Sequence, residues 1–320
     1  MSNMTMSLLV AGVFALALHA APAQAQLART FVSNATGSDL NDCSRNTPCR
    51  TFQTAHDKTL ANGEITVLDP GGYGAVTINR TISIINDGVG EAGALVSGGV
   101  AGITIAALAT DKVSLRGLTI KGIGFGGGTG IIFNTGAALT VENCAIRNIV
   151  GGGNGDGIRF QPSASSNLVV SNTFIADTGG SGILVLPATG NSGTINVIVN
   201  RVESYGNHFH GVILNGFQST GPINATMTDS IAANNTFVGV LANSDVGHSP
   251  VNLLVTRSAV SNNATGLEAD TNSFFFIGQS TVTGNATTFA TSGGMLRSYG
   301  DNYIDRNGDG SPPPTTTPRK

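Results

Sequence analysis

A short pattern that recurs between Val113 and Ile304 limits what this chain can fold into more than any other feature of its sequence. Its eight copies are separated by 26, 29, 28, 29, 28, 22 and 22 residues and begin at Gly117, Asn143, Asn172, Asn200, Asp229, Arg257, Gln279 and Asp301. A second anchor, a glycine followed by an aliphatic residue, keeps nearly the same step at Gly130, Gly157, Gly182, Gly211, Gly239 and Gly266. A regular period of this length predicts a solenoid in which each repeat forms one coil.

The residues within each repeat favour strands over helices. Apolar residues alternate with polar ones, as at Leu139 and Val141 or at Leu253 and Val255. Alternation with period two is typical of strands, and Gly, Asn, Ser and Asp separate the short runs. Leucine-rich and helical repeats need a leucine-spaced consensus or a 3.6-residue period, and the sequence has neither. The sequence therefore predicts an all-β parallel β-helix of about 8 to 10 coils over residues 64–310.

The glycine anchors also predict which side chains point inward. The first and third residues after each anchor are apolar, whereas the opposite register would bury Arg159 and Glu268. The second residues then form an outer stripe with four aliphatic members, Ile132, Leu184, Ile213 and Leu241. Such a stripe is expected to be covered, either by loops 187–193 or 217–222 of this chain or by a partner or a second copy.

The start of the chain predicts export to the periplasm or the extracellular space. Residues 7–20 form an apolar run that is too short for a membrane span, and Ala23-Gln24-Ala25 resembles a signal-peptidase site. We expect residues 1–25 to be a signal peptide and the mature chain to begin at Gln26. The net charge of -3 provides no basic patch for nucleic acid and no polybasic surface for a membrane.

Residues 26–63 are expected to form an N-terminal cap. Cys43 and Cys49 lie in a turn-rich loop and should pair in an oxidising compartment, because His56 alone makes metal binding a poor alternative. A helix is expected over residues 51–60 with Thr47 as N-cap, covering the open end of the β-helix.

Cys144 lies in a column of the repeat and is expected to be a buried free thiol. Residues 311–320 are rich in Pro and Thr and are expected to be a disordered tail.

The N-terminal region also resembles a known family. The runs Phe31-Val32-Ser33, Cys49-Arg50-Thr51-Phe52 and Gly63-Glu64-Ile65 resemble the opening of secreted bacterial β-helix proteins of the pectate-lyase-like superfamily, and the repeats extend the likeness to about Gly310. The resemblance implies a right-handed coil. It implies contact with polysaccharide only by analogy, because the superfamily contains lyases, hydrolases, epimerases, tailspikes and adhesins.

Three side chains of different chemistry precede consecutive glycine anchors: Asp156, Ser181 and His210. In a catalytic triad the histidine lies between the nucleophile and the acid, whereas here the serine would occupy the middle coil. This order argues against a hydrolase triad.

A glycoside hydrolase or lyase site at the same patch is the alternative. It would use Asp156, Arg159 and His210, with Glu203 or Asp177 as a second carboxylate. The stretch around Asp156 resembles an Asp-Gly-Ile segment of β-helix polygalacturonases, but their paired aspartates and their Gly-His-Gly and Arg-x-Lys motifs have no counterpart. A solvated turn is therefore favoured, since His and Asp are common in turns.

Two further motifs favour structural turns. The run Gly122 to Gly127 matches a dinucleotide-binding pattern, but a strand rather than a helix is expected to follow it. Asp305, Asn307 and Asp309 match the first half of a calcium loop, whose closing acidic position is Thr316. Asn307 also continues a column formed by Asn235, Asn263 and Asn285, whose amides can stack and bond to turn backbone. We therefore expect no cofactor, with calcium as the weaker alternative.

The sequence as a whole favours a secreted, non-catalytic β-helix that contacts polysaccharide or a cell-surface partner. With four Tyr and no Trp, binding would depend on hydrogen bonds, for which Asn207, His208 and His210 are the candidates. The alternatives are a polysaccharide lyase or glycoside hydrolase, and a structural or adhesive surface protein.

Overall fold

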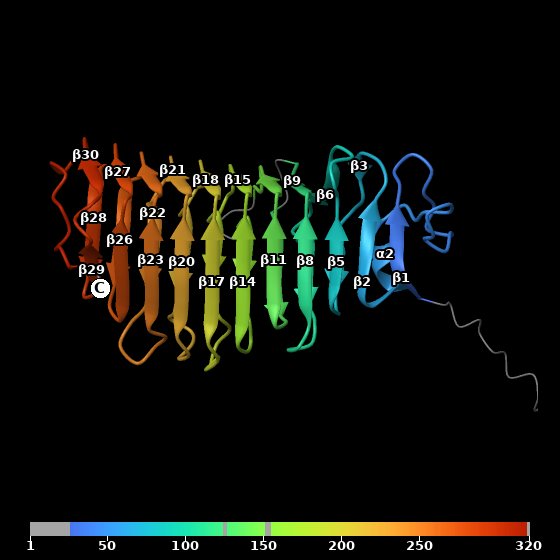
Figure 1. The fold of residues 1–320 in the computed structure, drawn as a ribbon, viewed down its shortest axis with the longest axis horizontal. Coiled ribbons are helices and arrows are strands. Elements are labelled where there is room, and N and C mark those ends of the chain that lie inside the picture. Colours follow the sequence, from blue (N-terminus) through green and yellow to red (C-terminus); the bar gives the residue numbers. More distant parts are fainter. Residues whose placement is uncertain (1–25, 124–126, 151–154, 319–320) are drawn as a thin grey trace, which may run out of the picture.

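The computed structural model describes residues 26–123, 127–150 and 155–318 and shows a rod built from three parallel sheets (Figure 1). The expected all-β parallel β-helix is confirmed, with sheets of 11, 10 and 9 strands. The predicted signal peptide, residues 124–126 of the glycine-rich motif and the last two residues of the chain lie outside the described residues.

The chain visits the three sheets in turn, so that neighbouring strands of one sheet are one coil apart. Sheet A consists of β1 (Leu27–Val32), β2 (Thr59–Val67), β5 (Ile82–Ile85), β8 (Lys112–Arg116), β11 (Ala138–Glu142), β14 (Ser166–Ser171), β17 (Ile195–Asn200), β20 (Ile223–Thr228), β23 (Val251–Thr256), β26 (Ser273–Gly278) and β29 (Met295–Ser298). Sheet B consists of β3 (Gly71–Gly72), β6 (Ala92–Val96), β9 (Thr119–Gly122), β12 (Ala145–Arg147), β15 (Phe174–Ala176), β18 (Glu203–Tyr205), β21 (Ile231–Ala233), β24 (Ala259–Ser261), β27 (Thr281–Thr283) and β30 (Tyr303–Asp305). Sheet C consists of β4 (Val76–Ile78), β7 (Ile103–Ala106), β10 (Ile131–Thr135), β13 (Ile158–Phe160), β16 (Ile183–Val185), β19 (Val212–Asn215), β22 (Val238–Asn243), β25 (Thr265–Asp270) and β28 (Thr287–Ser292).

The turn from sheet A to sheet B explains why several repeats begin with Gly, Asn or Asp. One residue of this turn adopts positive φ in successive coils, and these residues are Gly117, Asn143, Asn172, Arg201, Asp229, Arg257 and Gln279. Glycine, and to a lesser degree Asn and Asp, tolerates this conformation. At two of the other positions the side chain bonds to the coil before it: Arg201 donates to Asn172 Oδ1, and Arg257 forms a bidentate pair with Asp229.

A ladder of buried asparagines stabilises the turn from sheet B to sheet C. Its members are Asn207, Asn235, Asn263, Asn285 and Asn307. Each amide nitrogen donates to the amide oxygen of the next member at 2.8 to 3.0 Å, and that oxygen also accepts the backbone N–H of the previous member. The predicted stacking of turn amides is confirmed, and the ladder satisfies backbone groups that the turn would otherwise bury without partners.

The register predicted for sheet C is also confirmed. The first and third residues after each glycine anchor are buried in the core, and Phe133 and Phe160 stack there with ring centroids 4.5 Å apart. Strand β10 follows the glycine-rich motif, as expected. The interior is therefore a column of aliphatic and phenylalanine side chains that continues from coil to coil.

The N-terminal cap contains the predicted disulfide between Cys43 and Cys49. It differs from the prediction in two ways. The helix, α2, spans Phe52–Lys58 and is capped by Thr51, whose hydroxyl accepts the Thr54 N–H, whereas Thr47 donates to Asp42 in the preceding loop. Sheet A also begins earlier than the expected first coil, because β1 pairs with β2.

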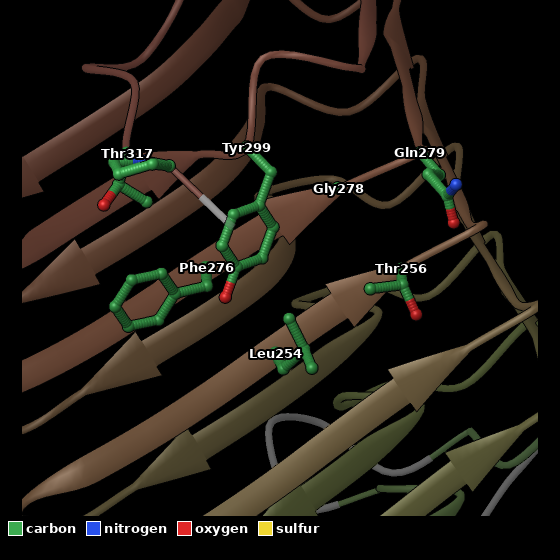
Figure 2. A pocket seen from close by; sticks show the side chains of 8 residues that line it. Leu254, Thr256, Phe276, Gly278, Gln279, Tyr299 and Thr317 are labelled. Atoms are coloured by element: carbon green, nitrogen blue, oxygen red, sulfur yellow. The ribbon is translucent and has the colours of Figure 1, made fainter. Parts of the chain in front are cut away.

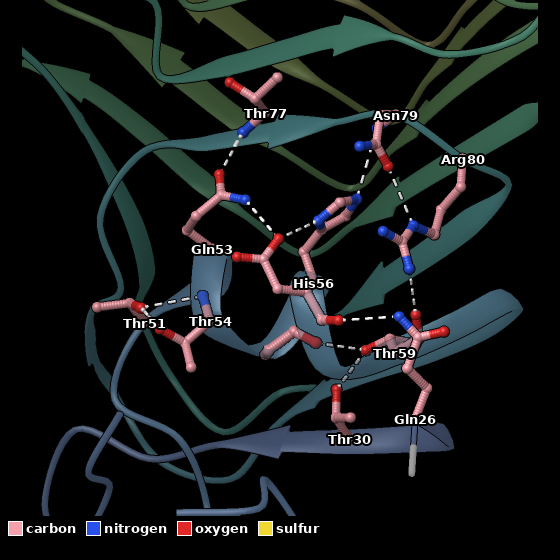
Figure 3. A network of polar contacts seen from close by, with 12 residues as sticks. Gln26, Thr30, Thr51, Gln53, Thr54, His56, Thr59, Thr77, Asn79 and Arg80 are labelled. Atoms are coloured by element: carbon pink, nitrogen blue, oxygen red, sulfur yellow. Dashed lines mark hydrogen bonds and ion pairs between the residues drawn. The ribbon is translucent and has the colours of Figure 1, made fainter. Parts of the chain in front are cut away.

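Helix α2 is held at the end of the rod by a polar network (Figure 3). His56 is buried; its Nε2 accepts the Asn79 N–H at 3.4 Å and its Nδ1 lies 3.0 Å from Asp57. Gln53 accepts the Thr77 N–H, so the helix bonds to the chain that follows β4 and to β4 itself. Burial lowers the pKa of His56, which keeps the ring neutral.

The C-terminal segment differs from the expected disordered tail. The Ser298 N–H donates to Thr315 O, and the Thr317 N–H donates to Ser298 O. The physical reason is that β29 is the last strand of sheet A, and its free edge presents backbone groups that the threonine-rich segment can pair.

We predict that Asn263→Leu lowers the free energy of unfolding by about 3 kcal/mol, because it leaves the N–H groups of Asn235 buried without an acceptor. Asn167→Leu is the matched control, since Asn167 belongs to an exposed amide pair, and it should cost less than about 0.5 kcal/mol. Urea unfolding followed by circular dichroism measures both. Equal losses in the two variants would contradict a stabilising role for the buried ladder.

We predict that Cys144 resists thiol reagents in the native protein, because it is buried and its pKa is raised to about 11 by burial. Labelling without reductant should modify no thiol in the folded protein and one after unfolding. After reduction, the unfolded chain should take up three labels, since Cys43 and Cys49 are then free as well. Rapid labelling of folded protein would show that the interior opens at this coil.

Candidate functional site

The structure brings Asp156 and Arg159 together at the start of strand β13 in sheet C. Asp156 Oδ2 accepts hydrogen bonds from Arg159 Nε at 2.8 Å and Nη2 at 2.6 Å, and its Oδ1 accepts the Ser181 N–H at 2.8 Å. The carboxylate is only 2% exposed. Both oxygens of the strongest catalytic candidate are therefore engaged by the protein.

Burial sets the electrostatics of this pair. It raises the pKa of Asp156 above its usual range, and the positive charge of Arg159 together with the Ser181 N–H only partly offsets the effect. The ion pair is local in sequence, because its members are three residues apart, whereas the Ser181 N–H comes from the next coil. The carboxylate is thus held both by its own coil and by the next one.

His210 occupies the same column as Asp156, two coils further on, with Ser181 between them. Its Nδ1 accepts the Val238 N–H at 3.3 Å, and burial lowers its pKa to about 4. His210 is therefore a neutral ring near pH 7. His208 is exposed, and its ring and the Phe209 ring are in T-shaped contact with centroids 5.2 Å apart.

Two phenylalanines complete a patch that was not predicted from the sequence. Phe209 and Phe237 stack with centroids 5.5 Å apart and an interplanar angle of 14°, and Phe237 is 46% exposed. Both residues stand two positions before a glycine anchor in consecutive coils, and this shared position was the signal that could have revealed them. We call His208, Phe209, His210 and Phe237 the aromatic–histidine patch.

The other candidate residues do not join this site. Glu203 lies on the outer face of β18 in sheet B, and Asp177 lies in the exposed turn after β15. Within the described chain, the partners of the Asp156 carboxylate are Arg159 and Ser181, and neither of these carboxylates is among them. Asn207, the third binding candidate, is 1% exposed, and its amide is bonded within the buried ladder.

The outer apolar stripe has the predicted register, and its two central residues are covered. Ile213 and Leu241 are 6% and 5% exposed, and they form a small cluster with Val238, against which Leu184 packs. Val238 is the residue before a glycine anchor, so the stripe is covered partly by a neighbouring column of the same sheet. The two central residues of the stripe therefore do not form an open apolar face.

The calcium-like segment forms a structural turn. Asp309 Oδ1 accepts the Thr288 hydroxyl at 2.6 Å and its Oδ2 accepts the Thr288 N–H at 2.8 Å, while Asn307 is the last member of the buried ladder. No group of three or more His, Cys, Asp or Glu side chains with metal-binding geometry occurs in the described residues. Two of the three motif residues are thus used by the fold.

No protein-family model and no curated protein matches the chain. Among solved structures, the chain is similar to a pectate lyase, with 15% identity, 87% of this chain and 70% of that chain covered, and a TM-score of 0.49. It is also similar to a rhamnogalacturonan lyase, with 13% identity, 89% and 88% covered and a TM-score of 0.42. A lacto-N-biosidase from Eubacterium ramulus matches with 10% identity, 87% and 68% covered and a TM-score of 0.41. At these identities and TM-scores, the chemistry of those proteins does not transfer to this chain.

We predict that His210→Gln weakens the acid sensitivity of the fold. The pKa of His210 is about 4 in the folded protein and about 6.5 when unfolded, so the unfolded chain binds more protons between these values. The wild type should therefore lose about 2–3 kcal/mol of stability from this group as pH falls from 7 to 4, and the variant should not.

The measurement is the difference in the free energy of unfolding between wild type and variant at each pH, because His56 contributes a shift of the same sign. His208→Gln, which replaces an exposed histidine, is the control. Parallel pH profiles for wild type and His210→Gln would contradict a buried neutral ring.

Proposed function

We propose that this protein is an exported β-solenoid that binds polysaccharide without cleaving it. The observation that carries the proposal is that both oxygens of the Asp156 carboxylate accept hydrogen bonds from the protein, one from Ser181 and the other from Arg159. Cleavage at this patch would require that carboxylate. Hydrolysis by inversion or retention needs two carboxyl groups on either side of the scissile bond, and Glu203 lies on β18 of sheet B, whereas Asp156 precedes β13 of sheet C.

The aromatic–histidine patch supports the binding part of the proposal. Phe237 presents an exposed ring that stacks on the ring of Phe209. Apolar ring faces pack well against the C–H faces of sugars. His208 offers an exposed imidazole, which can donate and accept hydrogen bonds with sugar hydroxyls.

The Cys43–Cys49 disulfide supports export, because such bonds persist in oxidising compartments. No helix in the described residues is long and apolar enough to cross a membrane.

A polysaccharide lyase or glycoside hydrolase is the second candidate. The raised pKa of Asp156 favours it, because a carboxyl group that stays protonated to higher pH is what a general acid requires. The closed ion pair argues against it, and an activity measurement separates the two functions.

We predict that the wild-type protein is retained by at least one insoluble polysaccharide and that Phe237→Ser reduces the retained fraction about tenfold, because it removes the exposed ring. Phe217→Ser is the matched control, since Phe217 is 40% exposed at a turn after β19 and should leave retention unchanged. Sedimentation with each polysaccharide measures the retained fraction.

The same mixtures should release no reducing ends and no unsaturated products. Release that Asp156→Asn abolishes would make the protein an enzyme and overturn the non-catalytic proposal. Failure to bind any polysaccharide would instead favour a structural or adhesive surface protein.

A further inference from the structure

The outer face of sheet A carries two adjoining hollows near the C-terminal end of the rod. One has a volume of about 450 Å³ and the other about 340 Å³, and both are lined by Leu254, Phe276 and Tyr299. Because they share these residues, the hollows form one continuous depression across β17, β20, β23 and β26, which we call the sheet A groove. The groove lies on a different sheet from the aromatic–histidine patch.

Aromatic rings form the apolar part of the groove. Figure 2 shows the Tyr299 ring beside Phe276, with Leu254 next to both. The Phe276 and Tyr299 rings are stacked with centroids 6.0 Å apart and an interplanar angle of 21°. Phe274 and Ile198 are 39% and 49% exposed, so the apolar strip continues along the face.

A ladder of exposed asparagines lies beside this strip. Asn252 donates to Asn224 Oδ1 at 2.9 Å, and Asn224 donates to Asn196 Oδ1 at 3.4 Å. An amide has two N–H donors and an oxygen with two lone pairs, and the ladder uses one of each. Asn196 and Asn224 therefore each present one further donor and one further acceptor position, at the coil spacing of about 4.8 Å.

The remaining lining is uncharged. Thr226, Thr256 and Gln279 add hydroxyl and amide groups, and Thr317 and Pro318 form a wall at the C-terminal end. That wall is held in place by the hydrogen bonds between Ser298 and the C-terminal segment. None of the residues that line the two hollows is Asp, Glu, Lys, Arg or His.

We propose that the sheet A groove is a second binding site, which holds one chain of an uncharged polysaccharide along the rod. Aromatic and aliphatic side chains beside a row of free amide donors and acceptors match a sugar chain, whose rings have apolar faces and whose hydroxyls both donate and accept. An acidic polysaccharide would find no cationic side chain in the lining. This inference rests on the proposed function in that the ligand is a polysaccharide, but it concerns a separate surface and a narrower class of ligand.

The test is native affinity electrophoresis of the full chain in gels that contain hydroxyethyl cellulose, xyloglucan, galactomannan or polygalacturonate. At least one of the three uncharged polymers should retard the wild type. Polygalacturonate should not bind in the groove. The double variant Phe276→Ser and Tyr299→Ser should raise the dissociation constant for that uncharged polymer at least tenfold. Phe237→Ser, on the other surface, should change it less than threefold.

Two single variants test the groove even if the double variant does not fold. Asn224→Ala removes an amide that lines the groove. Asn167→Ala is the control, because Asn167 accepts a hydrogen bond from Asn196 in the same ladder but lies outside the groove lining. Asn224→Ala should weaken binding several-fold and Asn167→Ala should not. Equal binding by wild type, Asn224→Ala and the double variant would overturn the inference.

The remaining outcomes separate this inference from the proposed function. Loss of binding only in Phe237→Ser would overturn the groove and leave the proposed function standing. Retardation by polygalacturonate alone would overturn the uncharged ligand class, and no retardation by any polymer would overturn both proposals. If the double variant instead changes the elution volume in size-exclusion chromatography without changing retardation, the groove binds a second copy of the chain and the inference is wrong.

Discussion

The fold depends on hydrogen bonding between successive coils, above all in the turn from sheet B to sheet C. Strands pair along all three sheets, but a turn has no ladder of its own, and its buried backbone groups would lack partners. The asparagines from Asn207 to Asn307 fill this gap, because from Asn235 onward each amide oxygen accepts both a side-chain and a backbone N–H from the coil before it. With the turns satisfied, coils stack in a constant register and the core continues along the rod.

Constant register also creates the aromatic–histidine patch and the sheet A groove. Residues at the same position of consecutive coils come to lie side by side, so single exposed side chains become columns. Phe209 and Phe237 form a stacked pair in this way, and Asn196, Asn224 and Asn252 form an exposed amide ladder. Each surface rests on paired strands, so its side chains are held at fixed spacings before any ligand binds.

The two surfaces differ in their charge. On sheet C, the buried carboxylate of Asp156 is neutralised by Arg159, and His210 is kept neutral by burial. The charge of Asp156 is thus compensated within the protein, and His210 carries none near pH 7. On sheet A, the groove has no charged lining residue, and its recognition chemistry comes from rings, amides and hydroxyls.

The coil period, the inward register of sheet C, the asparagine ladder and the Cys43–Cys49 pairing could all be predicted from the sequence. The first three depend on residue type and position within a repeat, which the constant register carries from coil to coil. The pairing depends on the short loop between the two cysteines. Only the tertiary structure decided that Asn207 is buried, that Thr51 caps α2, and that the C-terminal segment pairs with Ser298. It also decided that Asp156 is closed by Arg159 and Ser181 and that Phe276 and Tyr299 line a groove. These features depend on rotamers and on contacts between groups in different coils and in the chain ends, where the repeat no longer dictates the neighbours.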